Sequence, residues 1–203
     1  MRVSRAGASA SSPISGMSME PSKPALGESA CRDLLVLARN TLESYFATGQ
    51  VPAYQAGNPE LLKGGAAFVS LHCGEDLRGC IGLLSDEGEL YRTVQRCALS
   101  AALEDTRFKP VTLDEVAGLS IEISVLSPPR RVTDVQLIEV GKHGLIIARG
   151  GQRGLLLPQV AAKYNWDRNT FLSQTCRKAG LPANAWSQPD TVIQIFEAQV
   201  FSE

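Results

Sequence analysis

The sequence LRGCIG at residues 77–82 is the stretch around which the rest of the chain can be ordered. Two glycines alternate here with an arginine and a cysteine. Glycine weakens the interior of a strand, so a strand that contains two of them predicts close approach of another backbone or an unusual dihedral angle. The preceding segment AAFVSLHC, residues 66–73, also has the composition of a strand. A short loop at residues 74–76 is expected to join the two strands into a hairpin.

Side-chain alternation predicts the register of this hairpin. With residues 74–76 as the loop, the apolar side chains of both strands fall on one face, and a one-residue slip would mix the two faces. His72 is expected opposite Arg78 on the polar face. Ser70 is expected opposite Cys80, within cross-strand contact distance. The apolar face then contains Val69, Leu71, Leu77 and Ile81, and the polar face contains Phe68, Ser70, His72, Arg78, Cys80 and Gly82.

Two predicted helices flank the hairpin in the sequence. Apolar residues recur at helical spacing over residues 29–48 and again over residues 89–105, which predicts an apolar face on each helix. The second helix ends in two acids, the last of which is Asp105, and a cation should compensate them at the negative end of the helix dipole. Arg107 is the nearby cation and Arg78 the distant one. We expect Asp105 and Arg107 to form an ion pair at the helix end rather than a catalytic pair.

The rest of the chain alternates between strand and helix signals. The loop at residues 51–65 is longer than most connections, which predicts that it is packed on the surface or functional. The other expected elements are a capping-box turn at 112–115, a strand at 119–125, a short helix at 135–140, a hairpin of 145–149 and 154–157, a helix at 159–164, a helix from Asp167 to Gly180, and a strand at 191–201.

The overall composition is that of an ordinary globular protein. The chain has 203 residues, of which 44% are hydrophobic, enough for one substantial core or two packed subdomains. The net charge of −1 argues against a general affinity for nucleic acid or an anionic membrane. No apolar run approaches the roughly 18–20 residues that span a bilayer. The five cysteines are scattered, so we expect a reducing, cytoplasmic environment.

The first 27 residues differ from the rest. They consist mainly of Ser, Ala, Gly and Pro, with all three methionines, and they cannot bury enough surface to offset the entropy of ordering. Arg2 and Arg5 give a faint similarity to a transit peptide, but a disordered and dispensable extension or an upstream start codon is the stronger expectation. The folded part is therefore predicted to be residues 28–203.

Two candidate site residues lie in the LRGCIG stretch. Cys80 could be a nucleophile with His72 as its base and Arg78 supplying positive charge, because a thiolate needs such surroundings. The alternative is a buried cysteine that packs inside a tight hairpin, and this is the more frequent situation. For Arg78 two roles stay open, a structural ion pair and the binding of an anion.

A further candidate is His143, which lies in a turn flanked by glycines. It could face a cleft, although a hydrogen bond to the backbone is the simpler expectation. We predict that Arg78, Cys80, Asp105 and Arg107 border one shared cleft, to which His143 could be added. Two histidines far apart and no Cys-x-x-Cys pair predict no metal site. No cofactor is expected either, because the glycines match neither a P-loop nor a dinucleotide fingerprint.

Several ordered motifs in the chain resemble the AMMECR family, in particular its AmmeMemoRadiSam-system branch. They lie at residues 77–82, 101–108, 122–128, 143–144 and 154–160. The resemblance covers about residues 28–203. It implies an α+β fold, mostly an antiparallel sheet flanked by helices, with a larger and a smaller subdomain and a cleft between them. It also implies association with a Memo-like protein and a radical-SAM protein, and it implies no established reaction.

Three classes of function follow. The first is an accessory or catalytic component of a pathway shared with Memo-like and radical-SAM partners, which gene neighbourhood would test. The second is a ligand-binding or protein-interaction module without turnover, which a buried Cys80 would favour. The third, a nucleic-acid-binding regulator, is the least expected. Phosphate binding needs clustered Lys and Arg, and the chain offers few such clusters. The candidates are Arg130, Arg131, Arg149 and Arg153.

Overall fold

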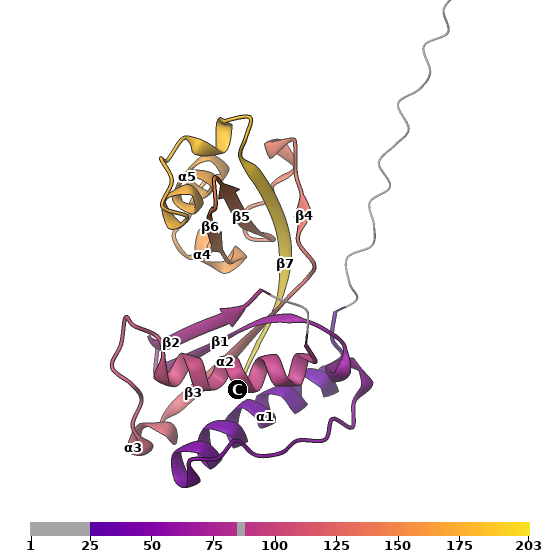
Figure 1. Ribbon diagram of the computed structural model, residues 1–203, viewed down its shortest axis with the longest axis vertical. Helices are drawn as coiled ribbons and strands as arrows, with labels where there is room; N and C mark the ends of the chain where they lie inside the picture. Colours follow the sequence, from indigo (N-terminus) through magenta and orange to yellow (C-terminus); the bar gives the residue numbers. More distant parts are fainter. Residues whose placement is uncertain (1–24, 85–87) are drawn as a thin grey trace, which may run out of the picture.

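The computed structural model describes residues 25–84 and 88–203, which form two lobes joined by one long strand (Figure 1). The larger lobe contains α1 (Glu28–Thr48), η1 (Pro59–Leu62), β1 (Ala66–Cys73), β2 (Asp76–Leu83), α2 (Leu90–Leu103), α3 (Leu113–Val116) and β3 (Leu119–Leu126). The smaller lobe contains β4 (Arg130–Arg131), η2 (Val135–Leu137), β5 (His143–Arg149), β6 (Gln152–Leu156), α4 (Pro158–Lys163), α5 (Arg168–Lys178) and η3 (Ala185–Ser187). Strand β7 (Val192–Ser202) runs through both lobes.

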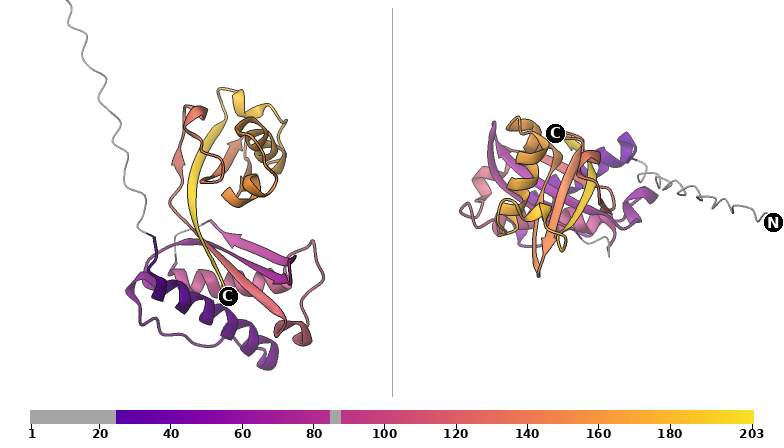
Figure 2. Two further views of the ribbon diagram at one scale, coloured as in Figure 1. Left: turned by 180° about the vertical axis from the view of Figure 1, so that it is seen from behind. Right: turned by 90° about the horizontal axis from the view of Figure 1, so that it is seen from above.

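The strands form a curled sheet in the order β2-β1-β3-β7-β5-β6, with β4 also paired to β7. The strand pairs are antiparallel, and helices flank them, which confirms the expected α+β fold. Strand β7 pairs with β3 through its last residues and with β5 through its first ones. The two lobes therefore share one continuous sheet that turns from one lobe into the other along β7 (Figure 2).

The hairpin register is confirmed in its main part and wrong near the turn. Val69 pairs with Ile81, and Ser70 pairs with Cys80, as predicted. The turn is shorter than expected, because β2 already begins at Asp76. A β-bulge then leaves Arg78 without a cross-strand partner, so His72 does not lie opposite it. A bulge adds one residue to one strand and breaks the alternation of its side chains.

The bulge also corrects the predicted faces of the hairpin. Leu77, expected on the apolar face, is 36% exposed and pairs with His72. Val69 and Leu71 are fully buried against the helices, as predicted. Alternation alone could not predict the bulge, because it does not fix how many residues the turn takes.

Helix α2 lies directly on the hairpin, and Gly79 makes this contact possible. A Cβ atom at Gly79 would lie 2.1 Å from the carbonyl oxygen of Ala101, far inside van der Waals contact. The backbone of α2 therefore approaches β2 as closely as only a glycine permits. On the opposite face of the sheet, the ring of Phe68 covers Gly82 and would collide with any side chain there. Close backbone approach, predicted from the two glycines, is confirmed at Gly79.

Most other predicted elements are present with small shifts at their ends. Thr112 and Glu115 form the expected capping box, and the Asp167 side chain accepts from the N–H of Thr170 to cap α5. The helix expected at residues 135–140 is only the short turn η2. Leu26, which the sequence places in the tail, is buried. Residues 1–24 of the expected tail lie outside the described part of the chain.

The smaller lobe sits over the face of the larger lobe's sheet that the helices leave open. Helices α1 and α2 cover one face (Figures 1 and 2). On the other, a separate apolar cluster joins Phe68 and Leu126 of the larger lobe to Leu157 and Phe196. This cluster packs the two lobes against each other.

Candidate functional site

The open face of the larger lobe's sheet carries the polar side chains that the sequence singles out. We call it the inter-lobe face and define it by Ser70 and His72 of β1, Cys80 of β2, and Glu122 and Ser124 of β3. The strand register places them on one side of the sheet, because Ser70 pairs with both Cys80 and Glu122. The opposite side of the same strands is apolar and packs on the helices.

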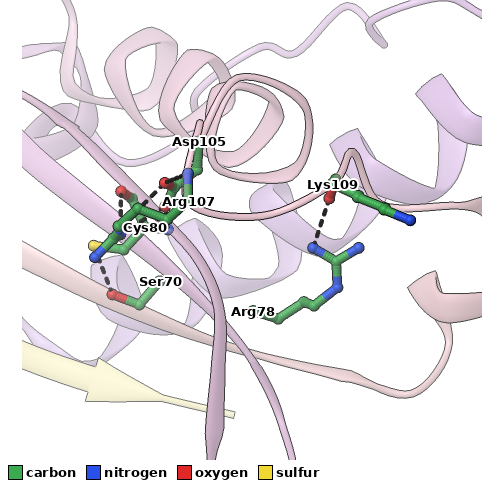
Figure 3. Close-up of polar contacts among 6 residues, drawn as sticks. All are labelled: Ser70, Arg78, Cys80, Asp105, Arg107 and Lys109. Atoms are coloured by element: carbon green, nitrogen blue, oxygen red, sulfur yellow. Dashed lines mark hydrogen bonds and ion pairs between the residues drawn. The ribbon is translucent and has the colours of Figure 1, made fainter.

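The backbone of Cys80 is held by an ion pair. Its N–H donates to Asp105 Oδ2 over 2.9 Å, and its carbonyl oxygen accepts from Arg107 Nη2 over 3.4 Å. Arg107 also donates to both carboxylate oxygens of Asp105, over 2.9 and 2.6 Å (Figure 3). The predicted ion pair is confirmed. Because β2 is the end strand of the sheet, this Asp105–Arg107 clamp takes the place of a neighbouring strand.

The thiol of Cys80 lies in surroundings that keep it protonated. Ser70 Oγ donates to its Sγ over 3.2 Å. Burial is the largest influence on the pKa of Cys80 and raises it. The hydrogen bond from Ser70 and the charge of Arg107 oppose this rise, and the carboxylates of Asp105 and Glu122 add smaller raising effects. A nucleophilic cysteine normally has a lowered pKa. Arg107 is paired with Asp105, and its charge lowers the pKa of Cys80 by less than burial raises it.

Arg78 lies away from Cys80 and has a structural role. Its guanidinium makes a two-point ion pair with Glu115, with Nε to Oε1 at 2.8 Å and Nη2 to Oε2 at 3.2 Å. It also donates to the carbonyl of Lys109 over 2.8 Å, on the far side from the clamp (Figure 3). The hydrogen bonds from Arg78 to the Glu115 carboxylate lower the pKa of Glu115 to about 2. Of the two roles left open for Arg78, the ion pair is the one present.

His72 belongs to the inter-lobe face but is not joined to Cys80. In residues 25–84 and 88–203, no hydrogen bond links His72 with Cys80. The Nε2 atom of His72 is buried and finds no partner among these residues. It is therefore a polar atom on this face with unused hydrogen-bonding capacity, which is uncommon for buried groups.

His143 faces a different part of the molecule. It lies on the same side of β5 as Leu145, in the core of the smaller lobe, whereas the alternate residues face the lobe junction. Its Nδ1 accepts from the N–H of Glu139 over 3.0 Å, which confirms the expected backbone hydrogen bond. Burial lowers its pKa. Within the described residues, the side chain of His143 therefore faces away from the lobe junction. The cleft that was expected to join it with Arg78, Cys80, Asp105 and Arg107 stays a prediction.

Sequence reasoning missed the contribution of the smaller lobe. Gln159, near the start of α4, donates through Nε2 to Ser124 Oγ over 3.2 Å and so bridges the lobes across the inter-lobe face. Its Oε1 atom is buried without a partner among the described residues. A single glutamine on a short helix carries no signal of such a role. Only the packing of α4 over β3 reveals it.

A small cavity lies at the junction of the lobes, where β1 begins and β3 ends. It has a volume of about 120 Å³, and its lining includes Gly65, Ala66, Leu126 and Pro128. Within the described residues, no group of three or more His, Cys, Asp or Glu side chains is placed to hold a metal ion. The helices described there also include none that is long and apolar enough to cross a membrane.

Comparisons with known proteins agree on one family. The AMMECR1 family model matches residues 35–201. A protein of Methanopyrus kandleri is 40% identical over 84% of this chain and 86% of its own length, and one of Pyrococcus furiosus is 39% identical over 84% and 86%. The crystal structure of an uncharacterised protein from Pyrococcus horikoshii is similar with a TM-score of 0.81 and 38% identity, over 84% of this chain and 90% of that one.

Proposed function

The chain belongs to the AMMECR1 family, and from this premise we propose that it is a binding component that recognises a ligand or a partner on its inter-lobe face. In this proposal Cys80 is part of the binding surface and is not a thiolate nucleophile. The partners are the Memo-like and radical-SAM proteins that the motif resemblance implies. The alternative, a catalytic component of the same pathway, would need a reactive Cys80.

The state of Cys80 is the observation that carries this proposal. Burial raises the pKa of its thiol against the opposing effect of the hydrogen bond from Ser70, and the clamp fixes its backbone on the outer side. A thiol with a raised pKa is mostly protonated at neutral pH, and it is the thiolate that attacks an electrophile. The side chain therefore supplies a small, weakly polar surface rather than a nucleophile.

The hydrogen-bonding inventory of the inter-lobe face supports binding and indicates the kind of group that fits. Gln159 Oε1 and the carboxylate of Glu122 are acceptors, and His72 Nε2 is free to donate or accept according to its tautomer. Both nearby arginines, Arg78 and Arg107, are already paired with carboxylates. The face therefore favours a ligand or peptide that offers N–H or O–H donors over an anion.

Alkylation of individual cysteines tests whether Cys80 is a nucleophile. Iodoacetamide labelling of the whole chain at several pH values, read by peptide mass spectrometry, compares Cys80 with Cys73 of the same hairpin, an exposed thiol. We expect Cys80 to react more slowly than Cys73 at pH 7 and to accelerate only in alkaline solution. Faster labelling of Cys80 than of Cys73 below pH 7 would restore the catalytic alternative.

A pull-down from native cells tests the binding role separately. The tagged chain is expected to retain Memo-like and radical-SAM proteins, and Glu122→Gln or Gln159→Ala should weaken that retention. Glu75→Gln, at the exposed hairpin turn, is the matched control and should leave it unchanged. If neither inter-lobe variant differs from this control, recognition does not occur on the inter-lobe face.

A further inference from the structure

Half of β7 presents an open edge. The N–H of Ser127 donates to the carbonyl of Glu197, and the N–H of Glu203 donates to that of Ile121. Odd-numbered residues of this strand therefore point their backbone groups toward β3, and even-numbered ones point away, because the two directions alternate along a strand. We call the side of β7 that faces away from β3 its outer side. Along the first half of β7, strand β5 pairs with this side, and the pairing begins at His143 and Glu197.

Beyond Glu197 the outer side of β7 has no strand beside it in the described part of the chain. Ala198, Val200 and Ser202 direct their N–H and carbonyl groups to this side. Val200 is 43% exposed, a high value for a valine in a sheet. Strand β7 ends at Ser202. The result is a notch along residues 198–202 that is bounded at one end by β5.

A groove runs beside this notch, between β7 and α1. Its volume is about 400 Å³. Apolar side chains, among them Leu35 and Phe201, form part of its lining. Glu28 and Arg32, one helical turn apart on α1, add charges of opposite sign. A strand that paired with the edge of β7 would direct every second side chain toward this groove.

Natural proteins cover exposed strand edges or use them. At the opposite edge of the same sheet, the clamp satisfies the outward N–H and carbonyl of Cys80. The edge at β7 lacks such a device among the described residues, although a groove flanks it. An edge beside a groove is the geometry that accepts an added strand.

We propose that the open edge of β7 is a self-association surface, on which residues 198–202 of two copies pair antiparallel about a two-fold axis at Val200. Two features make the surface self-complementary. Each copy contributes the same length of unpaired strand, and that length fits the notch left beside the other copy's β5. Because of the two-fold axis, the α1 helices of the two copies are antiparallel. This arrangement brings Glu28 of each copy toward Arg32 of the other.

This inference goes beyond the proposed function and does not depend on it. Val200 is paired with Ser124 and therefore lies on the side of the sheet that carries the inter-lobe face. Pairing at β7 would join two larger-lobe sheets into one and place two inter-lobe faces on the same side of it. A two-copy assembly could then contact two equivalent sites on a symmetric partner.

Sedimentation velocity on the full-length chain at about 50 µM tests the proposal, because mass action favours the dimer at such concentrations. The wild type is expected at twice the 21.8 kDa mass of one chain. Val200→Pro removes an outward N–H that the β3 ladder does not use, and Val200→Lys keeps it but adds a charge. Each of these two Val200 variants should raise the dissociation constant of the dimer at least about tenfold. Val51→Lys, at an exposed loop valine, is the matched control and should remain dimeric.

A charge swap tests the arrangement of the two copies. Glu28→Arg and Arg32→Glu, made singly, place like charges against each other and should weaken the dimer. The double variant restores opposite pairs and should regain it, with circular dichroism confirming the fold throughout. A monomeric wild type overturns the proposal. A dimer that survives both Val200 variants overturns it as well.

Discussion

The two outer edges of the larger lobe's sheet differ in how their backbone groups are satisfied. At β2, a carboxylate and a guanidinium bind the N–H and the carbonyl of Cys80. At β7, the same kinds of backbone group on Ala198, Val200 and Ser202 point outward beside a groove. A pair of side chains can thus substitute for a strand. It closes one edge and fixes the position of Cys80, while the other edge stays available for pairing.

The largest effect that tests this comparison should come from Gly79→Ala. The new Cβ would lie 2.1 Å from the carbonyl oxygen of Ala101, so α2 and the clamp that follows it would have to move. We expect the free energy of unfolding to fall by about 3 kcal/mol. Gly57→Ala is the control, because nothing lies within 4 Å of a Cβ atom added there. It should change the free energy of unfolding little. Similar urea midpoints for the two variants would mean that α2 is not seated on β2 as described.

Removing the carboxylate of the clamp should have the next largest effect. Asp105→Ala leaves the N–H of Cys80 without its acceptor and Arg107 without its counter-ion. The expected loss is about 2 kcal/mol, because an unsatisfied buried donor costs more than a missing surface pair. A double-mutant cycle with Arg107→Ala should give a coupling of at least about 1 kcal/mol. Additive losses would show that the two residues do not act as one clamp.

The pH dependence of stability should report the same carboxylate. Hydrogen bonding from Arg107 lowers the pKa of Asp105 to about 2, below its ordinary value of 3.8. A lowered pKa in the folded state stabilises the protein above the unfolded pKa, so the contribution is complete above about pH 4 and is lost as the pH falls toward 2. It amounts to roughly 2 kcal/mol. The stability difference between the wild type and Asp105→Asn should therefore shrink over this interval, and a constant difference would contradict it.

The Arg78–Glu115 pair should matter less than the clamp. Both side chains are partly exposed, so solvent screens their attraction, and Arg78→Ala should cost about 1 kcal/mol. Arg78→Lys should recover only part of this loss, because an ammonium cannot make the two-point contact. Arg92→Ala breaks a more exposed pair with Glu89 and serves as the control, with almost no expected change. Equal losses at Arg78 and Arg92 would remove the structural role assigned to Arg78.

Local sequence patterns predicted the parts of the fold that depend on neighbouring residues. Apolar alternation placed Val69 opposite Ile81, and the acids at the end of the second helix pointed to the pair of Asp105 with Arg107. Turn length is weakly encoded, so the bulge that turns Arg78 away from Cys80 was missed. Glu115 was recognised as a capping residue, but its second role as the partner of Arg78 joins segments far apart in the sequence.

The site itself depends mainly on contacts between lobes, which no local pattern reports. Gln159 reaches Ser124 because α4 packs over β3, and neither residue has a spacing that indicates this. For His143 the favoured expectation, a backbone hydrogen bond, is confirmed, and the alternation of β5 turns its side chain into the smaller lobe's core. Strand β7 was predicted, but its division between β3 and β5 follows from long-range pairing.

Amide hydrogen exchange, measured residue by residue on the full-length chain, tests the difference between the two edges most directly. Both the Cys80 and the Val200 N–H lie on outer edges of the sheet, and only the first has a side-chain acceptor, Asp105. In dilute solution we expect Cys80 to exchange at least about a hundredfold more slowly than Val200, because exchange requires the hydrogen bond to open. Equal exchange of the two amides would contradict a closed edge at β2 and an open one at β7.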